Sequence, residues 1–98
     1  MLTKDLAATP NVRGKKTKII VKYDVGFGNQ LFIRGQGGEL NWNKGIPMKN
    51  QTANEWVWET EAFFPEGEFK VLINDGQYET GPNHPLYCGS SFQYSPKF

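Results

Sequence analysis

The chain has 98 residues, which is enough for one domain with a thin core and too little for a second core. Eleven basic residues stand against ten acidic ones, and a net charge of +1 argues against a dedicated nucleic-acid binder. A single cysteine excludes an internal disulfide and favours a reducing compartment. The first residues hold no apolar run long enough for a signal peptide or a membrane span, so we expect a soluble, cytoplasmic monomer.

The chain begins with a polar segment that shows no sustained hydrophobic period. Residues 1–16 contain Pro10 and Gly14, and a small basic cluster runs from Arg13 through Lys15 and Lys16 to Lys18. Such a composition predicts a flexible tail, with the basic groups in solvent. We therefore place the folded domain at residues 17–98.

Two longer segments alternate between apolar and polar residues, as half-buried strands do. The first covers residues 17–25 and ends at the Gly26–Asn29 break. The second covers residues 55–64 and presents one predominantly apolar face, formed by Trp56, Trp58, Thr60, Ala62 and Phe64. We expect Trp58 and Phe64 in the core.

Shorter strands are predicted at residues 30–34, 69–73, 77–79 and 91–95. Asn74-Asp75-Gly76 is a strong hairpin signal between two of them. Residues 49–54 are polar and turn-like, and we expect residues 81–85 to be irregular because two prolines remove backbone donors there. Short strands separated by turns, with no helix, predict an all-β sandwich or barrel.

Signatures of catalysis or of a cofactor are missing. The glycines at 35, 37 and 38 are not followed by a helix, so they do not form a phosphate loop. One histidine, His84, and one cysteine, Cys88, make neither a usual zinc site nor a supported nucleophile pair. The glutamates around the Pro65 turn have no cleft between them and indicate a solvated edge. We expect no enzyme activity, no metal and no cofactor.

Trp42 lies in a Gly-rich polar loop, where a buried position is hard to arrange. A tryptophan in such a loop either folds back onto the core or contacts a ligand. Sugar rings have apolar C–H faces and a rim of hydroxyls, and aromatic platforms with polar side chains at their edge bind them. Trp42, Lys70, Tyr78 and Asn83 form a complete set for such a site if the fold brings them together.

Several sequence blocks carry a family resemblance. In order, they are Leu31-Phe32-Ile33-Arg34-Gly35, Leu40-Asn41-Trp42, Ile46-Pro47-Met48, Trp56, Phe64-Pro65-Glu66-Gly67-Glu68-Phe69-Lys70, Asp75-Gly76-Gln77-Tyr78 and Glu79-Thr80-Gly81-Pro82-Asn83. Together they resemble starch- and glycogen-binding modules of carbohydrate-binding families 20 and 48, which include the glycogen-binding domain of the AMP-activated kinase β subunit. The resemblance implies an immunoglobulin-like β-sandwich that binds α-1,4-glucan without catalysis. It further implies a polysaccharide or oligosaccharide partner, and a glycogen- or starch-metabolising enzyme as a second partner.

The resemblance also assigns roles to individual residues. Trp42 matches the first stacking platform, and Tyr78 stands where the family usually has a second tryptophan. Lys70 and Asn83 match residues that form hydrogen bonds to sugar hydroxyls. Phe32 and Trp56 fall where family 20 modules build a second, looser site, although Trp56 equally suits the core.

Two other functions remain open from the sequence. A sandwich that kept the fold and lost the sugar would serve as a protein–protein interaction module, with an exposed edge or aromatic patch as its contact surface. Single-stranded nucleic-acid binding would use Phe27, Phe32 and Trp42 as stacking groups, and the absence of net basic charge speaks against it.

Overall fold

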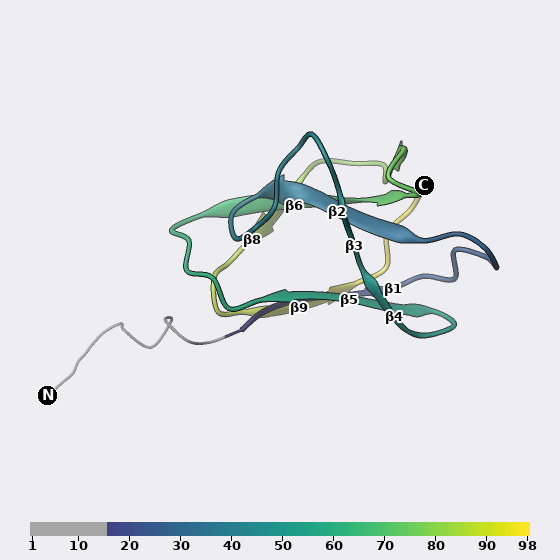
Figure 1. Ribbon diagram of the computed structural model, residues 1–98, viewed down its shortest axis with the longest axis horizontal. Coiled ribbons are helices and arrows are strands. Elements are labelled where there is room, and N and C mark those ends of the chain that lie inside the picture. The colour runs from purple at the N-terminus through teal and green to yellow at the C-terminus, as the bar shows by residue number, and fades with distance from the viewer. Residues whose placement is uncertain (1–15) are drawn as a thin grey trace, which may run out of the picture.

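A computed structural model describes residues 16–98, and these residues form strands and loops without a helix. The strands make two sheets that face each other, with β2, β6 and β8 in one layer and β1, β5 and β9 in the other (Figure 1). The predicted all-β sandwich is confirmed. The predicted tail, apart from Lys16, lies outside the described residues.

The four-stranded sheet has the order β4-β5-β1-β9. Its strands are β4 (Lys49–Thr52), β5 (Glu55–Thr60), β1 (Thr17–Lys22) and β9 (Ser91–Tyr94). β1 is antiparallel to β5 and parallel to β9. Cross-strand register pairs Ile19 with Trp58 and Val21 with Trp56, so the apolar side chains of both alternating segments enter the core together.

The second sheet has the order β3-β2-β6-β7, and β8 also pairs with β6. Its strands are β3 (Ile46–Pro47), β2 (Leu31–Gln36), β6 (Gly67–Ile73), β7 (Gln77–Tyr78) and β8 (His84–Leu86). β2 pairs with β6 along its whole length, so β7 and β8 share the opposite side of β6. Residues 79–83, between β7 and β8, form no strand ladder with β6.

Side chains from the inner faces of both sheets fill the core. Phe69, Val71, Leu31 and Ile33 have no solvent exposure, and Trp58 and Phe64 are buried as the sequence predicted. The outward-facing alternate residues of β2 and β6 are thereby left to form a surface on the opposite side of the sheet.

The hairpin between β6 and β7 has the predicted turn. Asn74 and Asp75 have φ values of 52° and 54°, which are the left-handed values that a type I′ turn requires at both central positions. Asn74 also uses its side-chain oxygen to accept a hydrogen bond from the Gln30 N–H, which ties the turn to the start of β2.

Two predictions about local structure were wrong. Residues 49–52 form strand β4 instead of a turn, and the polar sequence hid it because all four side chains of this edge strand face solvent. Residues 84–86 form β8 although Pro85 lacks an N–H. Pro85 is tolerated there because β8 pairs only with β6 and is therefore an edge strand.

Candidate functional site

The outer face of the second sheet carries rows of side chains set by the strand register. Phe32, Leu72 and Tyr78 form the first row across β2, β6 and β7. Arg34 lies opposite Lys70 in the next row. Leu72 points away from the core yet is fully buried, so other side chains cover this face of the sheet.

The loop that joins β2 to β3 rises over the outer side of this sheet (Figure 1). Asn41 shapes it, because its side-chain oxygen accepts hydrogen bonds from the N–H groups of Asn43 and Lys44 at 2.9 and 2.8 Å. The following residue, Trp42, is half-buried and does not belong to the hydrophobic core. The loop therefore carries a tryptophan whose side chain is partly exposed.

Arg34 connects this loop to the hairpin that carries Tyr78. Its Nη1 donates to the Trp42 carbonyl oxygen at 3.1 Å and to the Tyr78 hydroxyl at 3.3 Å. Since β2 and β7 lie on opposite sides of β6, the hydrogen bond between the Arg34 and Tyr78 side chains crosses over that strand. Two of the predicted platform residues are thus joined through one arginine.

Lys70 lies beside Tyr78 in the same surface. Its Nζ is 5.8 Å from the centroid of the Tyr78 ring, and the Cζ of Arg34 is at the same distance. Both cations are close enough for attraction to the aromatic ring. Lys70 Nζ also donates to the Gly81 carbonyl oxygen at 2.6 Å, and it retains two further N–H groups for other acceptors.

Asn83 lies at the far end of this surface. Its Nδ2 donates to Glu68 Oε1 at 3.3 Å. Glu68 lies two residues before Lys70, on the same face of β6. Segment 78–83 thus passes Leu72, Lys70 and Glu68 in turn. The structure brings Lys70, Tyr78 and the backbone of Trp42 together on one face, with Asn83 one step removed from them.

Phe32 and Trp56, assigned to a second site, do not share a surface. Phe32 lies on the outer face of β2, and the Trp42 loop passes close to it at Gly45. Trp56 is on the inner face of the other sheet and is only 5% exposed. The pairing of these two residues is therefore wrong, because they belong to opposite layers.

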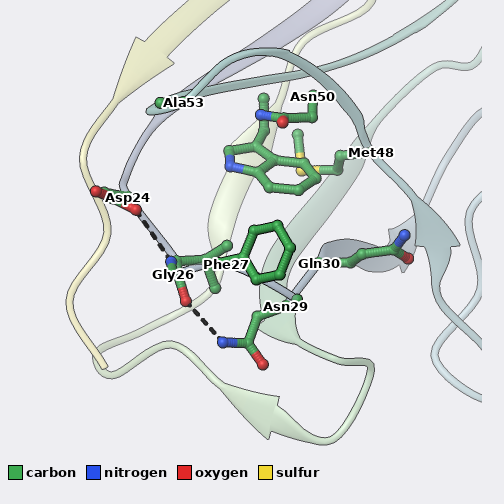
Figure 2. Close-up of a pocket in the computed structure, with 11 residues that line it drawn as sticks. Asp24, Gly26, Phe27, Asn29, Gln30, Met48, Asn50 and Ala53 are labelled. Carbon is green, nitrogen blue, oxygen red and sulfur yellow. Dashed lines mark hydrogen bonds between the residues drawn. The ribbon is translucent and has the colours of Figure 1, made fainter.

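Trp56 instead contributes to a pocket of about 570 Å³ at the end of the sandwich. The β1–β2 loop forms its rim, where Asp24 accepts a hydrogen bond from the Gly26 N–H and Asn29 donates to the Val25 carbonyl (Figure 2). Phe27 in this loop is fully exposed. The indole Nε1 of Trp56 is buried and has no hydrogen-bond partner.

A buried carboxylate holds the segment that carries Tyr78. Glu79 is 3% exposed, and its Oε2 accepts hydrogen bonds from the Val71 N–H and the Tyr94 hydroxyl, both at 2.7 Å. Its own N–H donates to the Val71 carbonyl, so Glu79 satisfies both backbone groups of Val71 in the gap between β7 and β8. His84 Nε2 lies 2.9 Å from the other carboxylate oxygen. Burial, together with this carboxylate, raises the pKa of Tyr94 far above its usual value, which keeps the hydroxyl protonated.

Arg34 and Asp75 also perturb each other. Their side chains form a hydrogen-bonded ion pair with Nε and Oδ1 2.9 Å apart. This bond lowers the pKa of Asp75 and raises that of Arg34. The Gly45 N–H donates to the second oxygen of Asp75 and contributes to the lowered pKa.

Sequence reasoning missed Arg34, Asp75 and Glu79 as contributors to this face. Arg34 is two residues after Phe32 on the same strand, so the sequence could have predicted that both side chains point to the same face. Its cross-strand partner depends on register, and the sequence does not give the register between β2 and β6. His84 was weighed against Cys88, whereas the structure directs it to Glu79 and places the Cys88 thiol near the Ala62 carbonyl.

Within residues 16–98 there is no cluster of three or more potential metal ligands. In the same part of the chain, no helix has the length and apolar character of a membrane span.

The fold and this surface define the chain as a small β-sandwich with an aromatic and polar outer face. No family model and no curated protein matches the sequence. Among solved structures, the chain is similar to a glycoside hydrolase family 15 glucoamylase from Hypocrea jecorina, with a TM-score of 0.65 and 16% identity. The match covers 97% of this chain and 20% of the glucoamylase, so the chain spans about a fifth of that protein's length. It is also similar to the CBM25-2 module of a beta/alpha-amylase from Paenibacillus polymyxa, with a TM-score of 0.49, 15% identity and coverage of 82% and 83% of the two chains. At these identities the glucoamylase match shows a shared fold.

Proposed function

We propose that this chain is a non-catalytic module that binds α-1,4-glucan on the outer face of the β3-β2-β6-β7 sheet. The observation that carries the proposal is the convergence of Trp42, Lys70 and Tyr78, with Asn83 beyond them, on that face. These residues come from four separate loops and strands. Their convergence agrees with the resemblance to family 20 and family 48 modules and with the fold shared with a glucoamylase.

Each residue has a role that follows from its chemistry. Trp42 supplies a flat apolar surface for one face of a glucose ring, and Tyr78, which is 41% exposed, supplies a second and smaller one. Lys70 offers its remaining N–H groups to sugar hydroxyls. The Asn83 amide both donates and accepts, which suits a hydroxyl that does the same.

The β1–β2 pocket is a second, looser contact for a longer glucan in this proposal. Phe27 is a fully exposed aromatic ring on its rim, and Asn50 provides a polar group beside it. Trp56 forms part of the wall and is too buried to act as a platform. Phe27 thereby takes the place that the sequence assigned to Phe32.

The test is retention on an α-glucan matrix. The wild-type chain should be retarded in a gel containing soluble starch, and Trp42→Ala should lose most of that retardation while it stays folded. One aromatic platform is worth about 1–3 kcal/mol by analogy with base stacking, so we expect affinity to fall by about ten- to a hundredfold. Tyr87→Ala, which truncates an exposed aromatic side chain in the loop between β8 and β9, is the matched control and should migrate like the wild type. Equal retardation of Trp42→Ala and wild type would refute the proposed site.

A protein–protein interaction module is the second candidate function, and β9 favours it. This strand lies at the edge of its sheet and contains neither a charged residue nor a proline, the features that usually protect an edge from pairing. A small pocket of about 170 Å³ beside it is lined by Ile19, Tyr87 and Phe92, among others. Wild-type protein that shows no interaction with starch would favour this candidate.

A further inference from the structure

Arg34 makes more contacts on the candidate face than any side chain to which the sequence assigned a role. Its Nε and Nη2 donate to the side chain and carbonyl of Asp75 at 2.9 and 3.1 Å, and its Nη1 donates to the Trp42 carbonyl and the Tyr78 hydroxyl. These contacts occupy four of the five N–H groups of the guanidinium. Arg34 therefore has little capacity left for a sugar, and its bonds connect the parts of the protein that would contact one.

Asp75 fixes the same loop at a second point. Its Oδ2 accepts a hydrogen bond from the Gly45 N–H at 3.2 Å, and Gly45 is three residues after Trp42. A Cβ at Gly45 would collide with the Asp75 carboxylate and with Phe32, so the close approach of loop and turn requires glycine there. The Trp42 loop is thus held at the Trp42 carbonyl by Arg34 and at the Gly45 amide by Asp75.

The position of Arg34 is hard to explain by stability alone. Arg34 lies directly opposite Lys70 in the β2–β6 register, and like charges in that relation destabilise a sheet. The ion pair with Asp75 is partly buried, with side chains 18% and 25% accessible, so the cost of desolvating its charges offsets much of the attraction between them. What this arginine does provide is a rigid planar group that reaches four acceptor atoms on three residues, Trp42, Asp75 and Tyr78, at once.

We propose that Arg34 and Asp75 are positioning residues that hold Trp42 and Tyr78 in a fixed relation, so that one sugar chain contacts both rings without first ordering the loop. The inference rests on the proposed glucan-binding function and deepens it. Fixing groups in their bound arrangement before the ligand arrives lowers the entropy cost of binding. Arg34 and Asp75, which we call the clamp, therefore increase the affinity for ligands that contact both rings. They have little effect on the affinity for a sugar that contacts only one ring.

The test compares a long and a short ligand on matched variants. Arg34→Met keeps the apolar stem and removes all four hydrogen bonds, while Arg34→Lys keeps the charge and cannot reach the four acceptors together. Lys22→Met breaks an ion pair with Glu55 on the other sheet and serves as the control. Affinity for maltoheptaose and for maltose is measured by calorimetry, and the order of the Trp42 indole N–H is measured by ¹⁵N relaxation without sugar.

We expect Arg34→Met and Arg34→Lys to weaken maltoheptaose binding by about five- to tenfold and maltose binding by less than about twofold. The Trp42 indole should become mobile in both variants, and Lys22→Met should match the wild type throughout. Unchanged maltoheptaose affinity, or an equal loss for both sugars, would overturn the clamp. If the wild type binds neither sugar, the glucan proposal fails by itself, and the relaxation data still decide whether Arg34 orders Trp42.

Discussion

Replacing Glu79 tests how the segment that carries Tyr78 is attached to the sheet. In the wild type its carboxylate accepts hydrogen bonds from the buried Val71 N–H and from the Tyr94 hydroxyl. Glu79→Ala leaves the Val71 N–H without a partner in the interior and the Tyr94 hydroxyl without one in a partly buried position. A buried unpaired donor costs about 1–3 kcal/mol and a lost bond to a partly buried hydroxyl about 0.5–1.5 kcal/mol, so the free energy of unfolding should fall by about 1.5–4.5 kcal/mol.

Glu79→Gln is the matched variant. One oxygen of the amide can still accept from Val71 and Tyr94, and its NH₂ group can donate to His84 Nε2 when that nitrogen is unprotonated. We expect this variant to lose about 1 kcal/mol, because bonds to a charged acceptor are replaced by bonds to a neutral one.

Urea unfolding followed by tryptophan fluorescence measures both variants, since Trp56 and Trp58 are buried in the core. Our reasoning is refuted if Glu79→Ala unfolds within about 1 kcal/mol of the wild type. It is also refuted if glutamine is as damaging as alanine, because the network would then depend on charge instead of on the acceptor oxygens.

Three further predictions follow from the core, the clamp and the platforms. Trp58→Ala removes a large buried aromatic side chain and should cost about 3–5 kcal/mol in the same urea assay; a loss below about 1 kcal/mol would contradict its core position. The pKa of Asp75 is lowered in the folded protein. The stability that its carboxylate contributes is therefore complete above the unfolded pKa and is lost as the pH falls through the lower folded value. Maltoheptaose affinity should therefore hold through neutral pH and decline only in acid, and Asp75→Asn should weaken binding at neutral pH while flattening that decline. Tyr78→Trp should preserve or improve the affinity by enlarging the platform, whereas Lys70→Ala should weaken it about fivefold, as expected for one exposed hydrogen bond; calorimetry that ranks these two variants in the opposite order would contradict the assigned roles.

The sequence predicted the strands that bury one face, because apolar and polar residues alternate along them. The alternation at Ile19 and Val21 marks a strand that buries every second residue, and β1 does so, whereas in β5 Val57 is buried as well as Trp56 and Trp58. The Asn74-Asp75-Gly76 turn was predictable because few residues accept the positive φ that it needs. Strand β4 gave no such signal, since a fully exposed edge strand is held by its backbone and leaves its side chains unconstrained.

The candidate site was predictable in part for a different reason. The family resemblance pointed to Trp42, Lys70, Tyr78 and Asn83 one at a time, and the structure places Lys70 and Tyr78 beside each other, with the Trp42 backbone joined to them through Arg34. What holds Trp42 and Tyr78 in relation to each other depends on contacts between residues about 40 positions apart, such as Arg34 with Asp75. Those contacts follow from strand register and loop path, which local patterns do not encode.

The most direct test of the central claim is an NMR titration of the wild-type chain with maltoheptaose, with cellohexaose as the β-linked control. We predict saturable shifts at the Trp42 indole, at Tyr78 and at the amides of segment 78–83, at millimolar maltoheptaose and not with the control sugar. If Trp42 and its neighbours show no shifts at that concentration, this face does not bind α-glucan and the account is contradicted.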